Sequence, residues 1–467
     1  MLSNFSIYHY AGILVTLLTV VIIGAFSSKR VRNARDFRGD SRQSSAAVVM
    51  GAIVGTLVGG SSTIGTAQLA FSYGLSACWF VIGSSVACIL LGTVYCRPLH
   101  QSTENTASGI IKKEFGPSAG MLSSVINACG MFMALVAQMI SAGAVWGIIF
   151  PGLTYPKALA LTIVLVLVYV VFGGVHGVGL IGIFKLVLLY LAVFGGGCLA
   201  LWKFGGFGGI LHHQAFSAGN FFNPLARGWS TDIGSALSAA LGCLGSQTYV
   251  QAIRSGSSVS SSRKGALLSA LMIPPIGIGA TLIGLYMRAN HPELAEAKLA
   301  LPYFLVTNTP PLLCGIVMGA ILITVIGASA GLTLGISSII SNDFFRAKSD
   351  KKDLLLSRVY IALLLFAAAA LSTGSTGNMI LDFSFLGLGV RAVSCVIAYT
   401  FALFWSGACK PRIMTAAMIL GPASILLSEL LNCPVDSLMV GYMTALLFLG
   451  AALRLEKHRA SLARFDR

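Results

Sequence analysis

Long apolar segments alternate with short polar segments along the whole chain. A helix needs about 20 mostly apolar residues to cross the hydrocarbon core of a bilayer. The chain contains thirteen such segments, so the pattern predicts an all-α membrane protein with about 13 transmembrane helices. The segments are 8–28, 45–73, 74–96, 119–149, 156–172, 177–202, 232–253, 265–288, 312–345, 354–372, 378–405, 411–431 and 434–454.

The composition supports this prediction and excludes other classes of protein. Only 10% of the 467 residues are charged and 56% are hydrophobic, whereas roughly 25% of residues are charged in soluble domains. So few charges cannot cover a water-soluble surface of this size, which argues against a soluble enzyme, a disordered chain or a collagen-like rod. None of the ten cysteines has metal-ligand spacing, and the adjacent His212 and His213 fall in a polar loop. We therefore expect no transition-metal site and no cofactor.

The distribution of basic residues predicts the orientation of the chain. Of the 31 Lys and Arg residues, 24 fall in alternate connections or in the C-terminal tail. Because basic residues gather on the cytoplasmic side, we expect a multi-pass protein of the plasma (inner) membrane. Its N-terminus is predicted outside and its C-terminus in the cytoplasm. Only Lys185 and Arg391 lie within predicted spans and away from the ends of those spans. The net charge of +16 is thus explained without nucleic acid as a partner.

Two of the spans contain clusters that a continuous helix disfavours, at 55–65 (GTLVGGSSTIG) and 242–247 (GCLGSQ). Glycine costs about 1 kcal/mol relative to alanine inside a helix, and non-helical backbone at membrane depth occurs only around protein or water-filled cavities. After the first span, these segments are the first and sixth of the next ten. Two interrupted helices in corresponding halves are typical of transporters with inverted repeats. The alternative is that the small residues only allow close helix packing.

This reasoning predicts five regions. They are an N-terminal helix with a basic cytoplasmic loop (1–43), a first five-helix repeat (44–203), an extracytoplasmic loop (204–231), a second repeat (232–405), and two C-terminal helices with a basic tail (406–467).

Five patches resemble the sodium:solute symporter family. They are Asp36-Phe37-Arg38-Gly39, the segment Gly59–Gly65 with Tyr73-Gly74, the turn Gly173–Gly177, the segment Gln247–Ala252 with Arg254, and the segment from Gly331 to Asp343-Phe344. The resemblance implies a LeuT-like 5+5 inverted-repeat fold and solute transport coupled to sodium. It places the main sodium site between the first and eighth core helices, with backbone carbonyls from Gly55, Val58 and Thr324.

The same resemblance implies side-chain hydroxyls at positions 327 and 328, but these residues are Gly327 and Ala328. The nearest hydroxyl belongs to Ser329, which a shift of one residue would bring into the site. On the fifth core helix, where family members often carry Asp and Gln, this chain has Gly182 and Lys185. In some related transporters a lysine on this helix replaces sodium and couples transport to protons. Coupling by sodium and coupling by protons therefore both remain open, as does simple snorkelling of Lys185 to the interface.

Polar side chains on three core helices are candidates for solute binding: Ser61, Ser62, Thr63, Gln68, Gln138, Ser141 and Gln247. Helix-to-helix hydrogen bonding is the alternative role. No arginine is expected in this cavity, so a small neutral or zwitterionic solute such as an amino acid is favoured over a strongly anionic one. Asp382 and Arg391, on the tenth core span, are interpreted as gate or structural charges.

The sequence therefore predicts a cation-coupled symporter that imports a small polar solute by alternating access, and not an enzyme. Its partners are the solute, the coupling cation and the lipid bilayer. A channel and a membrane sensor that binds solute without transport remain as alternatives.

Overall fold

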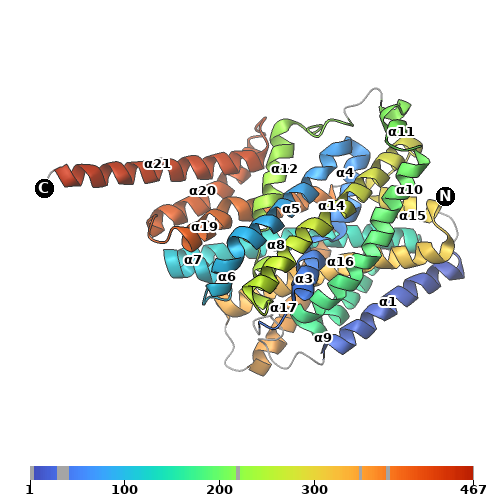
Figure 1. The fold of residues 1–467 in the computed structure, drawn as a ribbon, viewed down its shortest axis with the longest axis horizontal. Coiled ribbons are helices and arrows are strands. Elements are labelled where there is room, and N and C mark those ends of the chain that lie inside the picture. The colour runs from blue at the N-terminus through green and yellow to red at the C-terminus, as the bar shows by residue number, and fades with distance from the viewer. Residues whose placement is uncertain (1–4, 29–41, 217–220, 346–349, 375–378, 466–467) are drawn as a thin grey trace.

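The computed structural model describes residues 5–28, 42–216, 221–345, 350–374 and 379–465, and helices form nearly all of this part of the chain (Figure 1). The membrane-length helices and their continuations are α1 (Ile7–Ser28), α3 (Ala46–Leu57), η1 (Ser61–Gly65), α4 (Thr66–Tyr73), α5 (Trp79–Leu90), η3 (Leu91–Tyr95), α6 (Cys96–Gln101), α8 (Pro117–Ile149), α9 (Tyr155–Leu189), η4 (Tyr190–Phe194), α10 (Gly195–Lys203), α12 (Trp229–Gly242), α13 (Gln247–Ser255), α14 (Val259–Asn290), α16 (Pro311–Ile339), η7 (Ile340–Phe344), α17 (Asp350–Thr373), α18 (Ile380–Arg391), η8 (Ala392–Val396), α19 (Ile397–Phe404), α20 (Pro411–Leu430) and α21 (Ser437–Phe465). Shorter connecting helices are η2 (Gly74–Cys78), α7 (Ala107–Phe115), α11 (Phe207–Leu211), η5 (Gln214–Phe216), η6 (Ala297–Leu299) and α15 (Ala300–Asn308).

The described helices are long and apolar enough to cross a membrane many times. Nine helical stretches among the described residues reach membrane length, and three shorter apolar helices lie at Ile7–Thr19, Ala46–Leu57 and Tyr155–Val170. The short helix α7 lies between the predicted spans 74–96 and 119–149. Helix α15 was not predicted, because its nine residues are too few to give a clear periodic signal.

Both predicted helix interruptions are confirmed. Helix α3 ends at Leu57, and Val58 takes an extended conformation (φ −86°, ψ 92°) before helical structure resumes with η1. In the second half, α12 ends at Gly242 and α13 begins at Gln247. The two interruptions divide the first and sixth core helices, as the inverted-repeat pattern requires.

Helix α9 (Tyr155–Leu189) is one continuous helix that covers the fourth predicted core span and the start of the fifth, but it is not straight. Tyr169 and Lys185 are sixteen residues apart, about 24 Å along a straight helix. Yet the Tyr169 hydroxyl and Lys185 Cδ lie 3.0 Å and 3.6 Å from the position that a Cβ on Gly327 would take. The turn predicted at 173–177 falls within residues 171–181, whose side chains lie outside the described residues. The patch at 36–39 also lies outside them.

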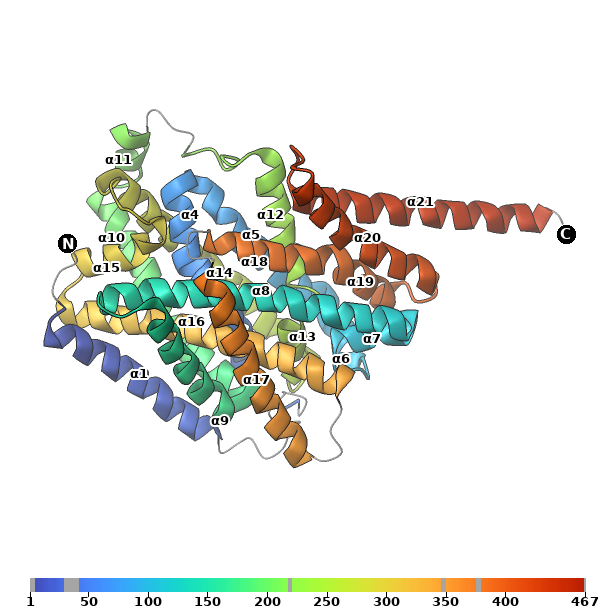
Figure 2. The same ribbon diagram turned by 180° about the vertical axis from the view of Figure 1, so that it is seen from behind.

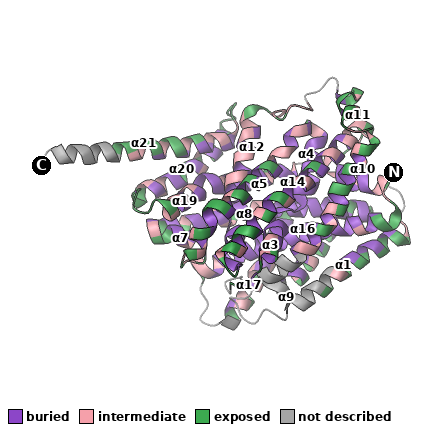
Figure 3. Cartoon of the chain, in the orientation of Figure 1, coloured by how far each residue is buried: buried purple, intermediate pink, exposed green. Residues whose placement is uncertain are grey.

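The core helices pack around α8 and α16, whereas α1, α20 and α21 lie at the periphery (Figures 1 and 2). About 83% of the apolar windows of α8 and α16 is buried, against 28% for α21. Buried residues concentrate in the centre and exposed residues on the outer helices (Figure 3). Exposed leucines on the outer helices, such as Leu14, Leu363 and Leu447, suit contact with lipid.

Candidate solute and coupling site

The first helix break is held by side chains from two other core helices. The Gly60 N–H donates to Gln138 Oε1 on α8 (2.7 Å), and Gln138 Nε2 donates to Ser61 Oγ (3.2 Å). Ser61 Oγ and Ser384 Oγ on α18 share a hydrogen bond of 2.7 Å. A backbone N–H freed by the break thus finds a buried acceptor, as apolar surroundings require. Ser384 was not predicted from the sequence, because a lone serine carries no distinguishing signal.

The other candidates of the first core helix surround this cluster. The Ser62 and Thr63 hydroxyls donate to Gly59 O (3.1 Å and 2.9 Å), and Gln68 Oε1 accepts from the Ile380 N–H at the start of α18 (3.0 Å). Ser141 packs so closely that a Cβ on Gly60 would lie 2.3 Å from its side chain. Ser62, Thr63 and Ser141 therefore lie around this break, whereas Gln68 contacts the start of α18.

Gln247 does not join this group. Its Oε1 accepts from the Ala107 N–H at the start of α7 (3.1 Å), and its Nε2 donates to Asn105 O (3.2 Å). Arg254, on the same short helix, donates to Ser102 O (3.0 Å). In this conformation α13 therefore holds the segment before α7 and closes the end of the molecule predicted to be cytoplasmic.

Lys185 is fully buried, with 0% exposure, so it does not reach the interface. Its ammonium donates to Gly55 O (2.7 Å) and to Thr324 O (3.1 Å). Gly55 lies in the last turn of α3, where carbonyls lack helical partners and carry the negative end of the helix dipole. The lysine thus joins the first and eighth core helices through two carbonyl oxygens.

No side-chain oxygen from positions 327–328 faces this ammonium. A Cβ added to Gly327 would lie 3.6 Å from Lys185 Cδ. The methyl group of Ala328 packs against Gly59, where an added Cβ would lie only 2.7 Å from it. The Ser329 hydroxyl donates to Val325 O within its own helix (2.8 Å). The Val58 carbonyl accepts no hydrogen bond from Lys185. A hydroxyl that the sequence did not reveal belongs to Tyr169, which is buried without a hydrogen-bond partner.

The second helix break has its own polar partners. Asn127 Nδ2 on α8 donates to Gly245 O (2.6 Å). Arg391, at the end of α18, donates from Nη1 to Ser246 Oγ (2.8 Å). Asp382, on the same helix, lies away from this break at the end predicted to face outside.

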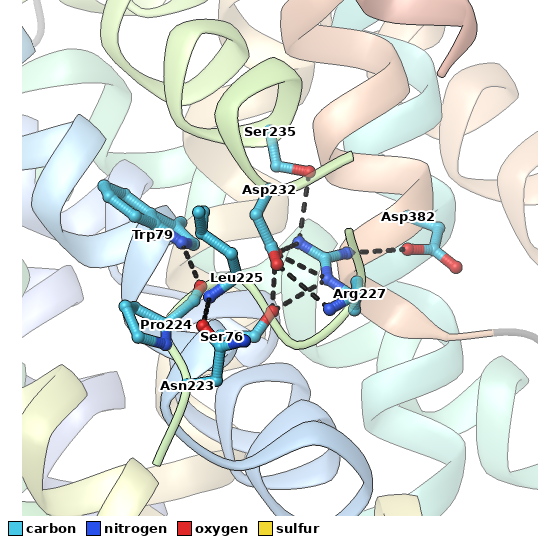
Figure 4. Close-up of polar contacts among 9 residues, drawn as sticks. All are labelled: Ser76, Trp79, Asn223, Pro224, Leu225, Arg227, Asp232, Ser235 and Asp382. Atoms are coloured by element: carbon cyan, nitrogen blue, oxygen red, sulfur yellow. Dashed lines mark hydrogen bonds and ion pairs between the residues drawn. The ribbon is translucent and has the colours of Figure 1, made fainter. Parts of the chain in front are cut away.

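A network of charged and polar groups closes that predicted outer end (Figure 4). Arg227 Nη2 and Asp232 Oδ1 are 2.9 Å apart, and Ser76 Oγ donates to the same carboxylate. Arg227 also approaches Asp382 (3.8 Å) and lies over the Phe385 ring, 5.5 Å from its centre. The network joins the loop before α12 to η2 and α18.

A cavity of about 440 Å³ opens beside this network. Residues of α12, α18 and the α20–α21 connection line it, including Arg227, Ser235, Asp382, Phe385 and Asp436. Such a volume lies within the usual range for small-molecule pockets. Phe383 and Phe385 line the cavity, and Ser384 between them contacts Ser61 of the first break.

Comparison with known proteins decides the family. The model of the sodium:solute symporter family matches residues 41–421. The chain belongs to this family. Among solved structures, it is similar over 97% of its length to 98% of a Na+-coupled sialic acid symporter in a substrate-bound outward-open state, with 17% identity and a TM-score of 0.80. It is also similar over 89% of its length to 93% of a nucleobase-cation-symport-1 family transporter in a closed conformation, with 14% identity and a TM-score of 0.57.

Membership of the sodium:solute symporter family establishes a multi-pass membrane transporter and not an enzyme. Cation-coupled symport of a small solute follows from the family. The structural neighbours support the LeuT-like fold. In this chain, Lys185 bonds carbonyl oxygens of both the first and the eighth core helices.

For this symporter we expect Asp232→Asn to lower stability strongly. Asp232 is fully buried and Arg227 nearly so, and removing one partner of a buried ion pair typically costs about 3–5 kcal/mol. Thermal unfolding of the purified protein in detergent would measure the change. Glu296→Gln, in a half-exposed pair with Lys298, is the control and should cost at most about 1 kcal/mol. Equal effects of the two substitutions would contradict a structural role for the buried pair.

Proposed function

We propose that this symporter imports a small solute by alternating access and that protonated Lys185 takes the place of the coupling sodium ion. The observation that carries the proposal is the pair of hydrogen bonds from Lys185 to Gly55 O and Thr324 O. Family resemblance assigns these two carbonyls to sodium. Sodium needs about five or six oxygen ligands, and Gly327 and Ala328 supply no hydroxyls here. An ammonium needs no more than three acceptors. A site with few oxygen ligands therefore suits the ammonium of Lys185 better than it suits sodium.

The charge on Lys185 would control the contact between the first and eighth core helices. When protonated, Lys185 holds the first core helix against the eighth, as a bound cation would. Loss of the proton removes the charge–dipole attraction to the C-terminal end of α3. The two repeats can then rock around the break, and the solute leaves on the other side. Because protonation favours the loaded state, a more acidic outer medium would drive import.

The cavity at the predicted outer end supplies the entry route. Arg227 and Phe385 would act as its floor, and Ser384 behind Phe385 is bonded to the first break. Opening of the Arg227–Asp382 contact, which is long at 3.8 Å, would let a solute pass from the cavity toward Ser61 and Gln138. The hydroxyl and amide groups there can bind a small polar solute such as a zwitterion. The sialic acid carried by one structural neighbour belongs in the first set of solutes to be tested.

Uptake by purified protein in proteoliposomes would test the coupling ion. A thermal-shift screen with amino acids, sugar acids and sialic acid first selects a solute. We expect an acid-outside pH gradient to drive its accumulation without sodium, and a sodium gradient at equal pH to drive none. We also expect sodium and potassium to give the same thermal stability in the absence of solute.

Three outcomes would contradict the proposal. Sodium-driven accumulation that survives a protonophore would show that sodium is the coupling ion. Flux that does not saturate and follows only the solute gradient would indicate a channel. Solute binding with neither accumulation nor exchange would indicate a sensor.

A further inference from the structure

The second helix break holds a buried cation that the coupling site does not use. Arg391 is about 2% exposed. Its Nε donates to Gly387 O (2.7 Å) and its Nη1 to Ser246 Oγ (2.8 Å). Its Nη2 donates no hydrogen bond within the described part of the chain. The third core helix approaches so closely that a Cβ on Gly130 would lie 2.8 Å from Arg391 Cγ.

Arg391 and Lys185 occupy corresponding places in the two repeats. Lys185 lies on the fifth core helix and contacts the first and eighth, whereas Arg391 lies on the tenth and contacts the sixth and third. Their positions relative to helix ends differ, however, although Arg391 also lies near Cys243, the C-cap of α12. Lys185 faces the last turn of α3, the negative end of a helix dipole, whereas Arg391 is bonded to Ser246, the residue that precedes α13. A cation at the positive end of a helix is repelled.

No described carboxylate compensates Arg391. The titratable side chains that face it are Cys243, Tyr249 and Cys395, which are ordinarily neutral. The nearest acid along its own helix, Asp382, contacts Arg227 instead. A buried charge without a counter-ion is costly. Arg391 therefore has no counter-ion among the described side chains.

Further polar groups at the same break remain free to bind. Asn127 Nδ2 bonds to Gly245 O, but its Oδ1 is buried without a partner. At the start of α13, the Tyr249 and Val250 N–H groups both donate to Ser246 O. The N–H groups of the first two helical residues have no acceptor within the helix and can bind an anion.

We propose that the second helix break binds a carboxylate group of the transported solute. Arg391 and the N-terminus of α13 form the anion site, and Asn127 Oδ1 accepts an N–H or O–H of the same solute. The inference rests on the proposed function and narrows its solute class to small carboxylates, including zwitterions. The proposed role of Arg391 also replaces the expectation from the sequence that the solute-binding cavity of the core contains no arginine.

Ligand binding to the purified protein in detergent would test this site without any ion gradient. The probes are lactate, pyruvate, gluconate and glycine as potassium-balanced solutions, with lactamide and pyruvamide as neutral counterparts and chloride and sulfate as inorganic anions. We expect thermal stabilisation by at least one carboxylate and by neither amide. We expect Arg391→Gln to weaken that binding at least about tenfold. Arg391→Lys should weaken it less, because lysine keeps the positive charge but cannot form the bidentate hydrogen bonds of a guanidinium group.

The empty protein provides a second measurement. If Arg391 is an uncompensated cation, Arg391→Gln should leave the melting temperature of the ligand-free protein unchanged or raise it. Arg412→Gln, at an exposed position of α20, is the control. The proposal is overturned if Arg391→Gln lowers this melting temperature, if no carboxylate stabilises the wild type, or if chloride or sulfate stabilises it as well as the best carboxylate does. Binding is measured without transport, so failure of proton coupling would leave this result intact.

Discussion

Substitution of Lys185 by Gln should strongly reduce accumulation driven by a pH gradient while leaving solute exchange in place. Glutamine can still donate to Gly55 O and Thr324 O, the two acceptors of the ammonium, but it carries no proton between the two sides. Coupling free energies of 1–3 kcal/mol correspond to changes of roughly 5- to 150-fold, and we expect driven uptake to fall by an amount in this range. Uptake by proteoliposomes with an acid outer medium measures it.

Exchange of labelled solute at equal pH and equal solute concentration separates coupling from binding. It should persist in Lys185→Gln, because the polar cluster at the first break does not include the lysine. Lys157→Gln is a matched control, since Lys157 lies exposed near the start of the same helix. Acid-driven accumulation by Lys185→Gln at the wild-type level would eliminate the lysine as the proton carrier.

Gly182→Ala should disrupt the packing that places Lys185 at its acceptors. A Cβ on Gly182 would lie 2.0 Å from Gly51 O and 2.7 Å from Gly51 C. These atoms belong to the backbone of α3, so they cannot yield without moving the helix. Overpacking of a core typically costs about 1–3 kcal/mol, and the shift would also separate the lysine from Gly55, one turn further along α3. We therefore expect a lower melting temperature together with lower proton-driven uptake.

Gly147→Ala supplies the comparison for this prediction. Gly147 lies inside α8, and a Cβ there would meet nothing within 4 Å. Replacing a free helical glycine by alanine usually stabilises by about 0.5–1 kcal/mol. If both alanine variants melt at or above the wild-type temperature, the close approach of α9 to α3 does not determine stability. Such a result would leave the position of Lys185 unexplained.

The sequence alone predicted most of the fold, because membrane helices leave strong local signals. Runs of apolar residues gave the thirteen spans, and glycine with small polar residues marked both interruptions at the observed positions. The division between α12 and α13 was visible in the same way. Family resemblance then supplied the repeat order. Each of these signals depends on composition within one segment, which needs no knowledge of neighbouring segments.

The partners of the buried charges depended on tertiary structure. Arg391 and Ser246 are far apart in sequence, and only the crossing of the tenth and sixth core helices brings them within hydrogen-bond distance. Gln247 follows a break, which suggested a role in solute binding, but its helix turns it toward α7.

For this protein, the sequence by itself predicted about thirteen membrane spans, marked where two of them stop, and placed a lysine and an arginine within those spans. It could not determine what those two cations face. Apolar periodicity fixes a helix and its length, whereas the electric field at a buried charge comes from helix ends contributed by distant segments. Only the packed helices placed Lys185 at the negative end of one helix and Arg391 at the positive end of another.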